Sequence, residues 1–360
     1  MADAWDPADF RSAVQAELDA FLDEQAARLA PLGPDAERLL TEARAVVSGG
    51  KRFRAAFCFW GYAVVAGRPT GSAEHAVLRA SAALELLHAS ALAHDDLMDA
   101  SDTRRGRPAS HRGFEAEHRE DDWRGDPEQY GAAGAILLGD LLLSWADELL
   151  RRCGLGWEFV GPALDVLDLC RTEVIAGQFL DVSVQARGRA SVEEAMTVLR
   201  YKSAKYSIER PLHIGAALAG ASTETLAGLS DFGLPLGEAF QLRDDVLGVF
   251  GDPSATGKPA GDDLVEGKRT VLVAHALASA PPADAGRLDV ALGSALLPAE
   301  VDDLRSIIDR SGARTAVEDA INELADRSLA ALDAGRSAGW DPAACGALTD
   351  LASAATQRSA

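Results

Sequence analysis

The sequence predicts an all-α protein, and three observations support this prediction. First, 48% of the 360 residues are hydrophobic but only 6% are aromatic. Second, alanine, leucine, arginine and glutamate dominate, all of which favour helices, whereas β-branched residues rarely cluster. Third, apolar residues recur at spacings of three and four, as on one face of a helix. No shift in composition marks a linker, so we expect a single domain over residues 1–360.

Apolar and amphipathic segments follow one another along the chain, separated by turn residues. The first two are amphipathic packing helices on either side of the turn sequence PLGP. Gly49 and Gly50 end the second helix, and a short basic segment then leads into an apolar run. The predicted segments are, in order, 10–30, 35–48, 55–67, 84–99, 131–150, 159–184, 192–220, 232–252 and 270–280, with further amphipathic helices to the C-terminus.

Three places break this pattern. Residues 111–131 are polar, charged and punctuated by glycine, so we expect a loop or lid there, which could contain a short helix. Pro211 should kink or interrupt its segment after Arg210, because proline cannot donate a backbone hydrogen bond. Residues 251–268 form a second loop, rich in glycine, proline and aspartate. Weaker breaks at SAPPADAG and GWDP divide the C-terminal helices.

Composition limits the function classes. A net charge of −21 argues against nucleic acid or an anionic membrane as the main partner, because neutralising phosphates needs a basic surface. The N-terminus is acidic without an apolar signal region, and no uncharged apolar run reaches the roughly 18 residues of a spanning helix. The four cysteines are scattered without Cys-x-x-Cys spacing, which favours a reducing compartment. We therefore expect a cytoplasmic protein without stable membrane insertion.

The segment 84–99 is apolar on almost every side but ends in three carboxylates. Asp95 and Asp99 are four residues apart and share one helix face, with Asp96 turned about 100° away. Like charges at this spacing repel each other, and burial worsens the repulsion. A divalent cation would relieve it, and a set of oxygen ligands points to Mg²⁺ rather than Zn²⁺.

A second acidic pair, Asp244 and Asp245, also follows an apolar helix. A single DDxxD pattern is weak support for a site, because it often marks only a solvated helix face. Two such helix ends would be more specific, because Mg²⁺ takes one or two carboxylates together with phosphate oxygens and water. The pair of motifs therefore predicts a clamp that holds a diphosphate through several metal ions.

Basic residues flank both acidic clusters. Arginine offers a planar fork for phosphate and lysine a point charge, so the mixture suits one or two diphosphate groups. Three of the lysines lie in glycine-rich breaks, which favours a binding role over surface solubility. The flanking residues are Lys51, Arg54, Arg104, Arg105, Lys202, Lys205, Lys258 and Lys268.

Taken together, these motifs resemble the trans-isoprenyl diphosphate synthases, the polyprenyl synthetase family. The matching segments are GGKRFR, HDDLMDASDTRRG, GQFLD, YKSAKYS and FQLRDDVLGVFGD followed by GKPAGDDLVEGKRT, in the family's order and approximate spacing. They extend from Gly49 to Thr270, and within the family the chain looks most like geranylgeranyl diphosphate synthases. The resemblance implies a helical bundle around a deep central cavity (isoprenoid synthase type), usually a homodimer. The motif-bearing core would span about 49–270, with C-terminal helices over 270–360.

The resemblance also implies roles for individual residues. Asp95 and Asp99 would ligate two Mg²⁺ ions and Asp244 a third, giving about three per site with Mn²⁺ as an alternative ion. Asp96 and Asp245 complete the two catalytic motifs. The allylic diphosphate would be bound by these residues: Arg104, Lys202 and Lys258, with Gln241, Lys268 and Ser203 nearby, the serine replacing a usual threonine. Isopentenyl diphosphate would be bound by these: Lys51, Arg54, His88 and Arg105.

Product length should depend on residues one or two turns before the first acidic motif. Family members with short products carry bulky aromatic residues four or five positions before the first aspartate, where this chain has Ala91 and Ser90. The open floor predicts a product longer than C15, most often the C20 geranylgeranyl diphosphate, with C25 or longer and C15 as alternatives. Leu87, with Leu141 or Trp145 on a neighbouring helix, is a candidate for the next plug.

The second motif departs from the family pattern, which leaves other functions open. Gly248 stands at its usual third aspartate, and Asp252 is the nearest later carboxylate. A non-catalytic synthase subunit is therefore an alternative. A terpene cyclase using one diphosphate is another, because it also ionises an allylic diphosphate beside a DDxxD. A di-iron carboxylate protein is a further one, because Glu85-x-x-His88 and Glu115-x-x-His118 mimic its paired motif.

Overall fold

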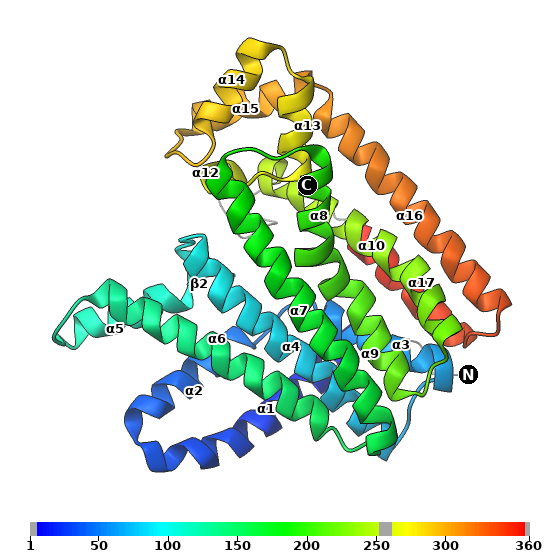
Figure 1. The fold of residues 1–360 in the computed structure, drawn as a ribbon. Coiled ribbons are helices and arrows are strands. Elements are labelled where there is room, and N and C mark those ends of the chain that lie inside the picture. Colours follow the sequence, from blue (N-terminus) through cyan, green and yellow to red (C-terminus); the bar gives the residue numbers. More distant parts are fainter. Residues whose placement is uncertain (1–5, 252–260, 357–360) are drawn as a thin grey trace. The chain divides into compact units, whose positions relative to one another are not determined.

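The computed structural model describes residues 6–251 and 261–356, which are almost entirely helical (Figure 1). The all-α prediction is therefore confirmed. The chain divides into two compact units, each described by itself below. The first unit contains Met1–Asp165 and Ile214–Gly220, and the second contains Val166–His213 and Ala221–Ala360.

The first unit is built on the apolar helix α4. Its elements are α1 (Pro7–Leu29), the 3₁₀ turn η1 (Ala30–Leu32), α2 (Pro34–Val46), α3 (Phe53–Ala66), α4 (Ser72–Met98), β1 (Thr103–Arg104), β2 (Arg107–Pro108), α5 (Ser110–Glu120) and α6 (Pro127–Arg151). Helix α4 packs against α6, α3 and α1, which explains why it is apolar on almost every side (Figure 1). Among the described helices it alone is long and apolar enough to cross a membrane, and 78% of its most apolar window is buried inside the protein.

The second unit is organised around the long helix α10. Its elements are α8 (Val192–Leu199), the π-helix η2 (Arg200–Glu209), α10 (Thr223–Phe250), α12 (Asp262–Val265), α13 (Val271–Ser279), α14 (Pro282–Ala291), α15 (Pro298–Arg310), α16 (Ala313–Ser337) and α17 (Pro342–Thr356). Helix α10 packs against α16 and η2. Two further helices, α7 (Trp157–Arg187) and α9 (Arg210–Leu218), run across the boundary between the units. The predicted breaks at SAPPADAG and GWDP are confirmed, since α14 begins at Pro282 and α17 at Pro342.

The predicted loop at 111–131 does contain the short helix that was allowed for, but most of the segment is helical and only residues 121–126 form a loop. Helix α5 covers Ser110–Glu120, and α6 already begins at Pro127, where the Asp126 carboxylate accepts the Glu128 N–H at 3.0 Å. The buried face of α5 contains His111, Phe114 and His118, and it packs against α6. Only one of these three side chains is apolar, so the periodic recurrence of apolar residues that indicates a helix is missing from this segment.

Pro211 does not interrupt its segment, because α9 begins at Arg210 and continues through the proline. The irregularity lies upstream, in the π-helix η2, where the Arg210 N–H donates to the Lys205 carbonyl five residues back. A wider turn removes the clash between a proline ring and the carbonyl four residues before it. A glycine makes room for this turn, because a Cβ at Gly237 on α10 would lie 2.5 Å from the Ala204 carbonyl oxygen.

Candidate active site

The first acidic motif separates its carboxylates by environment. Asp96 is only 3% exposed, and its Oδ1 accepts a hydrogen bond from Arg104 Nε at 2.9 Å. Asp95 and Asp99 are both partly exposed and lie one turn apart at the end of α4, where the Asp99 N–H donates to the Asp95 carbonyl at 2.8 Å. The buried carboxylate therefore holds an arginine, while the four-residue spacing places Asp95 and Asp99 on one side of the helix end.

The short β-ribbon after α4 positions two arginines. Strands β1 and β2 pair in antiparallel register around Arg105 and Gly106, whose φ angles of 53° and 73° are typical of a type I′ turn. Arg104 reaches back to Asp96, whereas Arg105 donates from Nη1 to the Ser48 carbonyl at 3.2 Å. The ribbon thus connects the first acidic motif to the GGKRFR segment.

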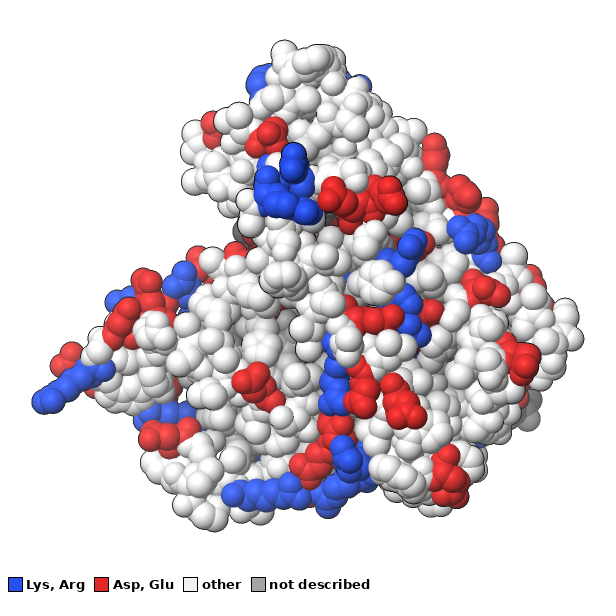
Figure 2. All heavy atoms as spheres, in the orientation of Figure 1, with Lys and Arg blue, Asp and Glu red and all other residues white. Residues whose placement is uncertain are grey.

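Positive charge gathers around His88 in the first unit. The pKa of His88 is held well below its usual value by burial and by the charges of Arg54, Arg105, Arg104 and Arg52, so the imidazole is neutral at physiological pH. On the face drawn in Figure 2, by contrast, basic side chains lie among acidic ones. The predicted residues Arg54, His88 and Arg105 therefore do lie close together, and with Lys51 exposed beside Arg52 they form a site suited to an anion.

The di-iron interpretation is wrong, because arginines satisfy both of its glutamates. Glu85 receives a hydrogen bond from Arg52 at 3.0 Å, and Glu115 pairs with Arg112 and Arg119 at 2.6 Å each. Over residues 6–251 and 261–356, no group of three or more His, Cys, Asp or Glu side chains is arranged to hold a metal ion.

The residues predicted to control product length differ in where they lie on α4. Ala91 is partly exposed and lies one turn before Asp95 on the face that also carries His88. Leu87 and Ser90 are each only 3% exposed, and Ser90 is turned about 140° from Asp95. On α6, Trp145 is buried with its ring edge-on to Phe21, and Leu141 is partly exposed. Only Ala91 thus shares the face of the first acidic motif.

The second acidic motif repeats the pattern of the first. Asp244 is partly exposed, whereas Asp245 is buried and accepts a hydrogen bond from Gln241 Nε2 at 3.0 Å. Burial raises the pKa of Asp245 well above its usual value, and the nearby charges of Asp263 and Asp244 raise it further. In each motif one aspartate is accessible and its neighbour in sequence is buried against a hydrogen-bond donor.

Asp263 takes up the space of the missing third carboxylate. A Cβ added at Gly248 would fall on the carboxylate of Asp263, which α12 brings back against α10. Sequence reasoning missed this residue, although a glycine at a motif position and a pair of aspartates 15 residues later were a usable signal (263 − 248 = 15). Asp252 and Lys258 lie outside the described residues. Lys268 is described, and its ammonium group contacts Glu266 at 2.6 Å.

We expect Gly248→Asp to destabilise the protein rather than restore a motif. The new side chain would collide with Asp263 and add a like charge, and overpacking of this kind costs about 1–3 kcal/mol in the free energy of unfolding. Denaturant unfolding of the purified variant measures this loss. The double variant Gly248→Asp/Asp263→Gly should recover most of it, whereas a single variant as stable as the parent would contradict the clash.

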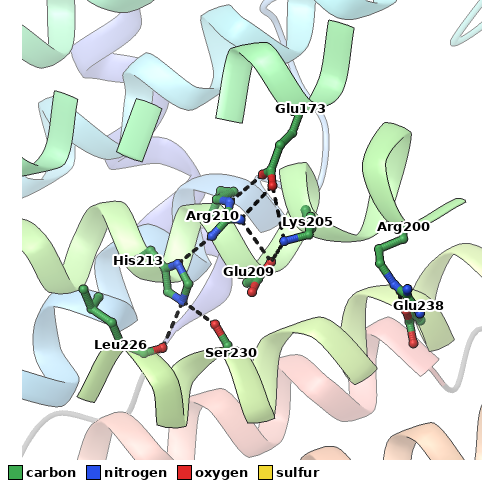
Figure 3. A network of polar contacts seen from close by, with 9 residues as sticks. All are labelled: Glu173, Arg200, Lys205, Glu209, Arg210, His213, Leu226, Ser230 and Glu238. Atoms are coloured by element: carbon green, nitrogen blue, oxygen red, sulfur yellow. Dashed lines mark hydrogen bonds and ion pairs between the residues drawn. The ribbon is translucent and has the colours of Figure 1, made fainter. Parts of the chain in front are cut away.

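The π-helix η2 carries Lys202 next to a buried ionic network. Lys202 Nζ lies 2.6 Å from Asp181 Oδ2. Lys205 instead joins the network drawn in Figure 3, with contacts of 3.3 Å to Glu173 and 3.1 Å to Glu209. Of the two lysines, Lys205 is therefore engaged in holding η2 against α7, and Lys202, with the partly exposed Ser203, stays the candidate for ligand binding.

These carboxylates fit Mg²⁺ bound together with a ligand. Asp95 and Asp99 in the first unit and Asp244 in the second unit are partly exposed oxygen donors, whereas Asp96 and Asp245 are buried against hydrogen-bond donors. Mg²⁺ commonly takes one or two carboxylates and completes its shell with phosphate oxygens and water. Each acidic motif, taken by itself, therefore offers the carboxylate ligands that such an ion uses.

Comparison with known proteins places the chain in a family. A family model for polyprenyl synthetase matches residues 37–310. The geranylgeranyl diphosphate synthase of Methanosarcina mazei is 36% identical over 260 residues, which is 72% of this chain and 72% of that protein. The geranylfarnesyl diphosphate synthase of Natronomonas pharaonis is 34% identical over 274 residues, which is 70% of this chain and 75% of that protein.

A solved structure extends the similarity to nearly the whole chain. The crystal structure of geranylgeranyl pyrophosphate synthase from Corynebacterium glutamicum, complexed with isoprenyl diphosphate and magnesium, has a TM-score of 0.94 and 41% sequence identity. The similarity covers 99% of this chain and 100% of that one. The predicted resemblance and the isoprenoid synthase type of helical fold are both confirmed. The chain belongs to the polyprenyl synthetase family, the trans-prenyl diphosphate synthases.

Proposed function

We propose that this protein condenses isopentenyl diphosphate with allylic diphosphates to form the linear C20 product geranylgeranyl diphosphate. The proposed length of the product rests on the small size of Ala91, which lies one turn before Asp95 on the face of the first acidic motif. A methyl group there leaves room for a chain to extend along α4. The C20 products named for the Methanosarcina and Corynebacterium relatives support this choice.

The charged residues would act by binding and orienting the two diphosphates. Asp95, Asp99 and Asp244 would hold Mg²⁺, about three ions per site, and Mg²⁺ supplies the positive charge that stabilises a departing diphosphate. Arg104 and Lys202, each held by a carboxylate at 2.6 to 2.9 Å, would direct their charge at the same group, with Lys258, Gln241 and Lys268 beside them. Their preorganisation favours ionisation to an allylic cation.

The second substrate, isopentenyl diphosphate, would be bound by a separate group of residues. Lys51, Arg54, neutral His88 and Arg105 would hold isopentenyl diphosphate so that its double bond attacks the allylic cation. Loss of a proton then restores an alkene, and the released diphosphate is a sufficient base. Apolar surroundings protect the cation from water.

Product sizing tests this proposal directly. The protein is incubated with Mg²⁺, isopentenyl diphosphate and, separately, the five-, ten- and fifteen-carbon allylic diphosphates. A C20 diphosphate is the expected product, and chelation of the metal with EDTA should abolish its formation. A C25 product would favour the activity named for the Natronomonas relative. A cyclic hydrocarbon would favour the cyclase alternative, and no elongation with any primer would favour a non-catalytic subunit.

Apolar side chains exposed on two helices support a homodimer. Leu137 on α6 is 60% exposed, and Ile175 and Phe179 on α7 are 58% and 70% exposed. Large exposed apolar residues that recur along a helix are typical of a subunit interface. Light scattering after size-exclusion chromatography should give twice the chain mass. The four cysteines are all buried, and we propose a location in the reducing cytoplasm.

A further inference from the structure

Arg52 combines two unfavourable features at one position of the first unit. Its backbone is left-handed, with φ 56° and ψ 35°, a conformation that is unfavourable for a residue with a Cβ. Its side chain is also only 3% exposed, and burying a guanidinium is unfavourable unless it is well paired. A glycine would adopt this backbone without strain. The arginine must therefore be explained by what its side chain contacts.

The guanidinium of Arg52 is held by three acceptors from separate parts of the chain. It donates to Glu85 Oε2 at 3.0 Å, to Gln15 Oε1 at 2.5 Å and to the Val47 carbonyl at 2.5 Å. The planar fork of arginine can serve all three, which the ammonium group of a lysine cannot match in geometry. Arg52 thus ties the segment before α3 to α1, α4 and the end of α2.

Glu85 completes the connection at the start of α3. Its second oxygen, Oε1, accepts the Ala55 N–H at 3.2 Å. The N-cap residue of α3 makes no side-chain capping hydrogen bond of its own, so this carboxylate satisfies one of the helix's open donors. A single buried glutamate on α4 therefore holds both Arg52 and the first turn of α3.

The residues on either side of Arg52 are the ones proposed to bind isopentenyl diphosphate. Lys51 precedes it, and Arg54 lies two residues later in the first turn of α3. The preceding Gly49 and Gly50 have positive φ angles. Because glycine has no Cβ, this part of the backbone can adopt many conformations when it is not held. His88 lies three residues after Glu85, so one turn of α4 carries both the anchoring carboxylate and a proposed ligand.

We propose that the Arg52–Glu85 ion pair is a positioning device that orients Lys51 and Arg54 for the diphosphate of isopentenyl diphosphate. Both side chains are buried, so the pair would act through its neighbours rather than by contact with the substrate. The inference rests on the proposed assignment of Lys51, Arg54 and Arg105 to this substrate. It predicts that breaking the pair harms the binding of isopentenyl diphosphate selectively, because the allylic diphosphate is bound by other groups.

Two variants test the pair, and a third serves as control. Arg52→Gly keeps the left-handed backbone but removes the guanidinium, and Glu85→Gln keeps the shape but removes the charge. Each should raise KM for isopentenyl diphosphate about tenfold or more, with KM for the allylic substrate within about twofold of the parent value. Arg52→Lys should give an intermediate KM. The control Glu148→Gln breaks the ion pair between α6 and Arg28 of α1 and should change neither KM.

Hydrogen exchange and calorimetry separate this inference from the proposed substrate site. Backbone amides of residues 48–54 should exchange faster in Glu85→Gln than in the parent or in Glu148→Gln, and titration with isopentenyl diphosphate alone should give a raised Kd. Unchanged exchange would overturn the positioning role whether or not the substrate binds here. Faster exchange with unchanged Kd, or an equal rise in KM for both substrates, would overturn it as well. If the parent protein fails to bind isopentenyl diphosphate while exchange is faster in the variant, the assignment of this substrate is overturned. The proposed effect of the ion pair on substrate binding is then overturned with it.

Discussion

Replacing Asp95 by asparagine is expected to lower kcat for chain elongation by about two to three orders of magnitude. Asparagine keeps the shape and one oxygen of the side chain but loses the negative charge that holds a divalent cation. Asp95 is partly exposed, whereas Asp96 is buried and binds Arg104, so the loss of the Asp95 charge should affect the metal more than the fold. The Mg²⁺ concentration needed for half-maximal activity should rise together with the loss in kcat.

A second measurement distinguishes metal binding from a folding defect. In the parent protein, Mg²⁺ added with inorganic diphosphate should raise the melting temperature, because ligands that bind only the folded state stabilise it. Asp95→Asn should lose most of this shift while melting at the same temperature without ligand. The control Asp140→Asn changes an exposed carboxylate on α6 and should retain both activity and the shift. Elongation by Asp95→Asn within about twofold of the parent rate would contradict the assignment of Asp95 as a ligand.

The variant Ala91→Phe is expected to change the product from C20 to C15 or shorter. Ala91 lies one turn before Asp95 on the same face of α4 and is partly exposed, so a phenyl ring there would occupy the path of the growing chain. The rate of the first condensation should fall much less than the yield of the longer product. Chromatography of the dephosphorylated products measures both quantities.

The control for this experiment is the same substitution at a remote position. Ala27→Phe places a phenyl ring on an exposed site of α1 and should leave the product distribution unchanged. An unchanged C20 product from Ala91→Phe would show that Ala91 does not line the path of the chain. Ser90→Phe is less informative, because Ser90 is buried on another side of α4 and a larger side chain there would disturb packing.

Much of the fold could be predicted because the helices depend mainly on local sequence patterns. Helix α4 and helix α10 are long, strongly apolar and bounded by turn residues, and both were expected from sequence. Helix α5 was missed because two of its buried side chains are histidines, whose burial depends on what α6 offers them. The π-helix η2 was missed because its geometry depends on the space beside Gly237, which no sequence pattern displays.

The sequence by itself determined the helical class, the spacing of Asp95 and Asp99 on one face, and the basic segments around both motifs, since these follow from composition and from the 3.6-residue repeat. Tertiary structure alone decided which charged groups are engaged with one another. Arg52 and Glu85 are 33 residues apart, and Asp263 on α12 meets Gly248 on α10 although it lies 15 residues later in the chain (263 − 248 = 15). Such contacts depend on how distant segments pack, and burial then forces each charge to find a partner, which local periodicity cannot specify.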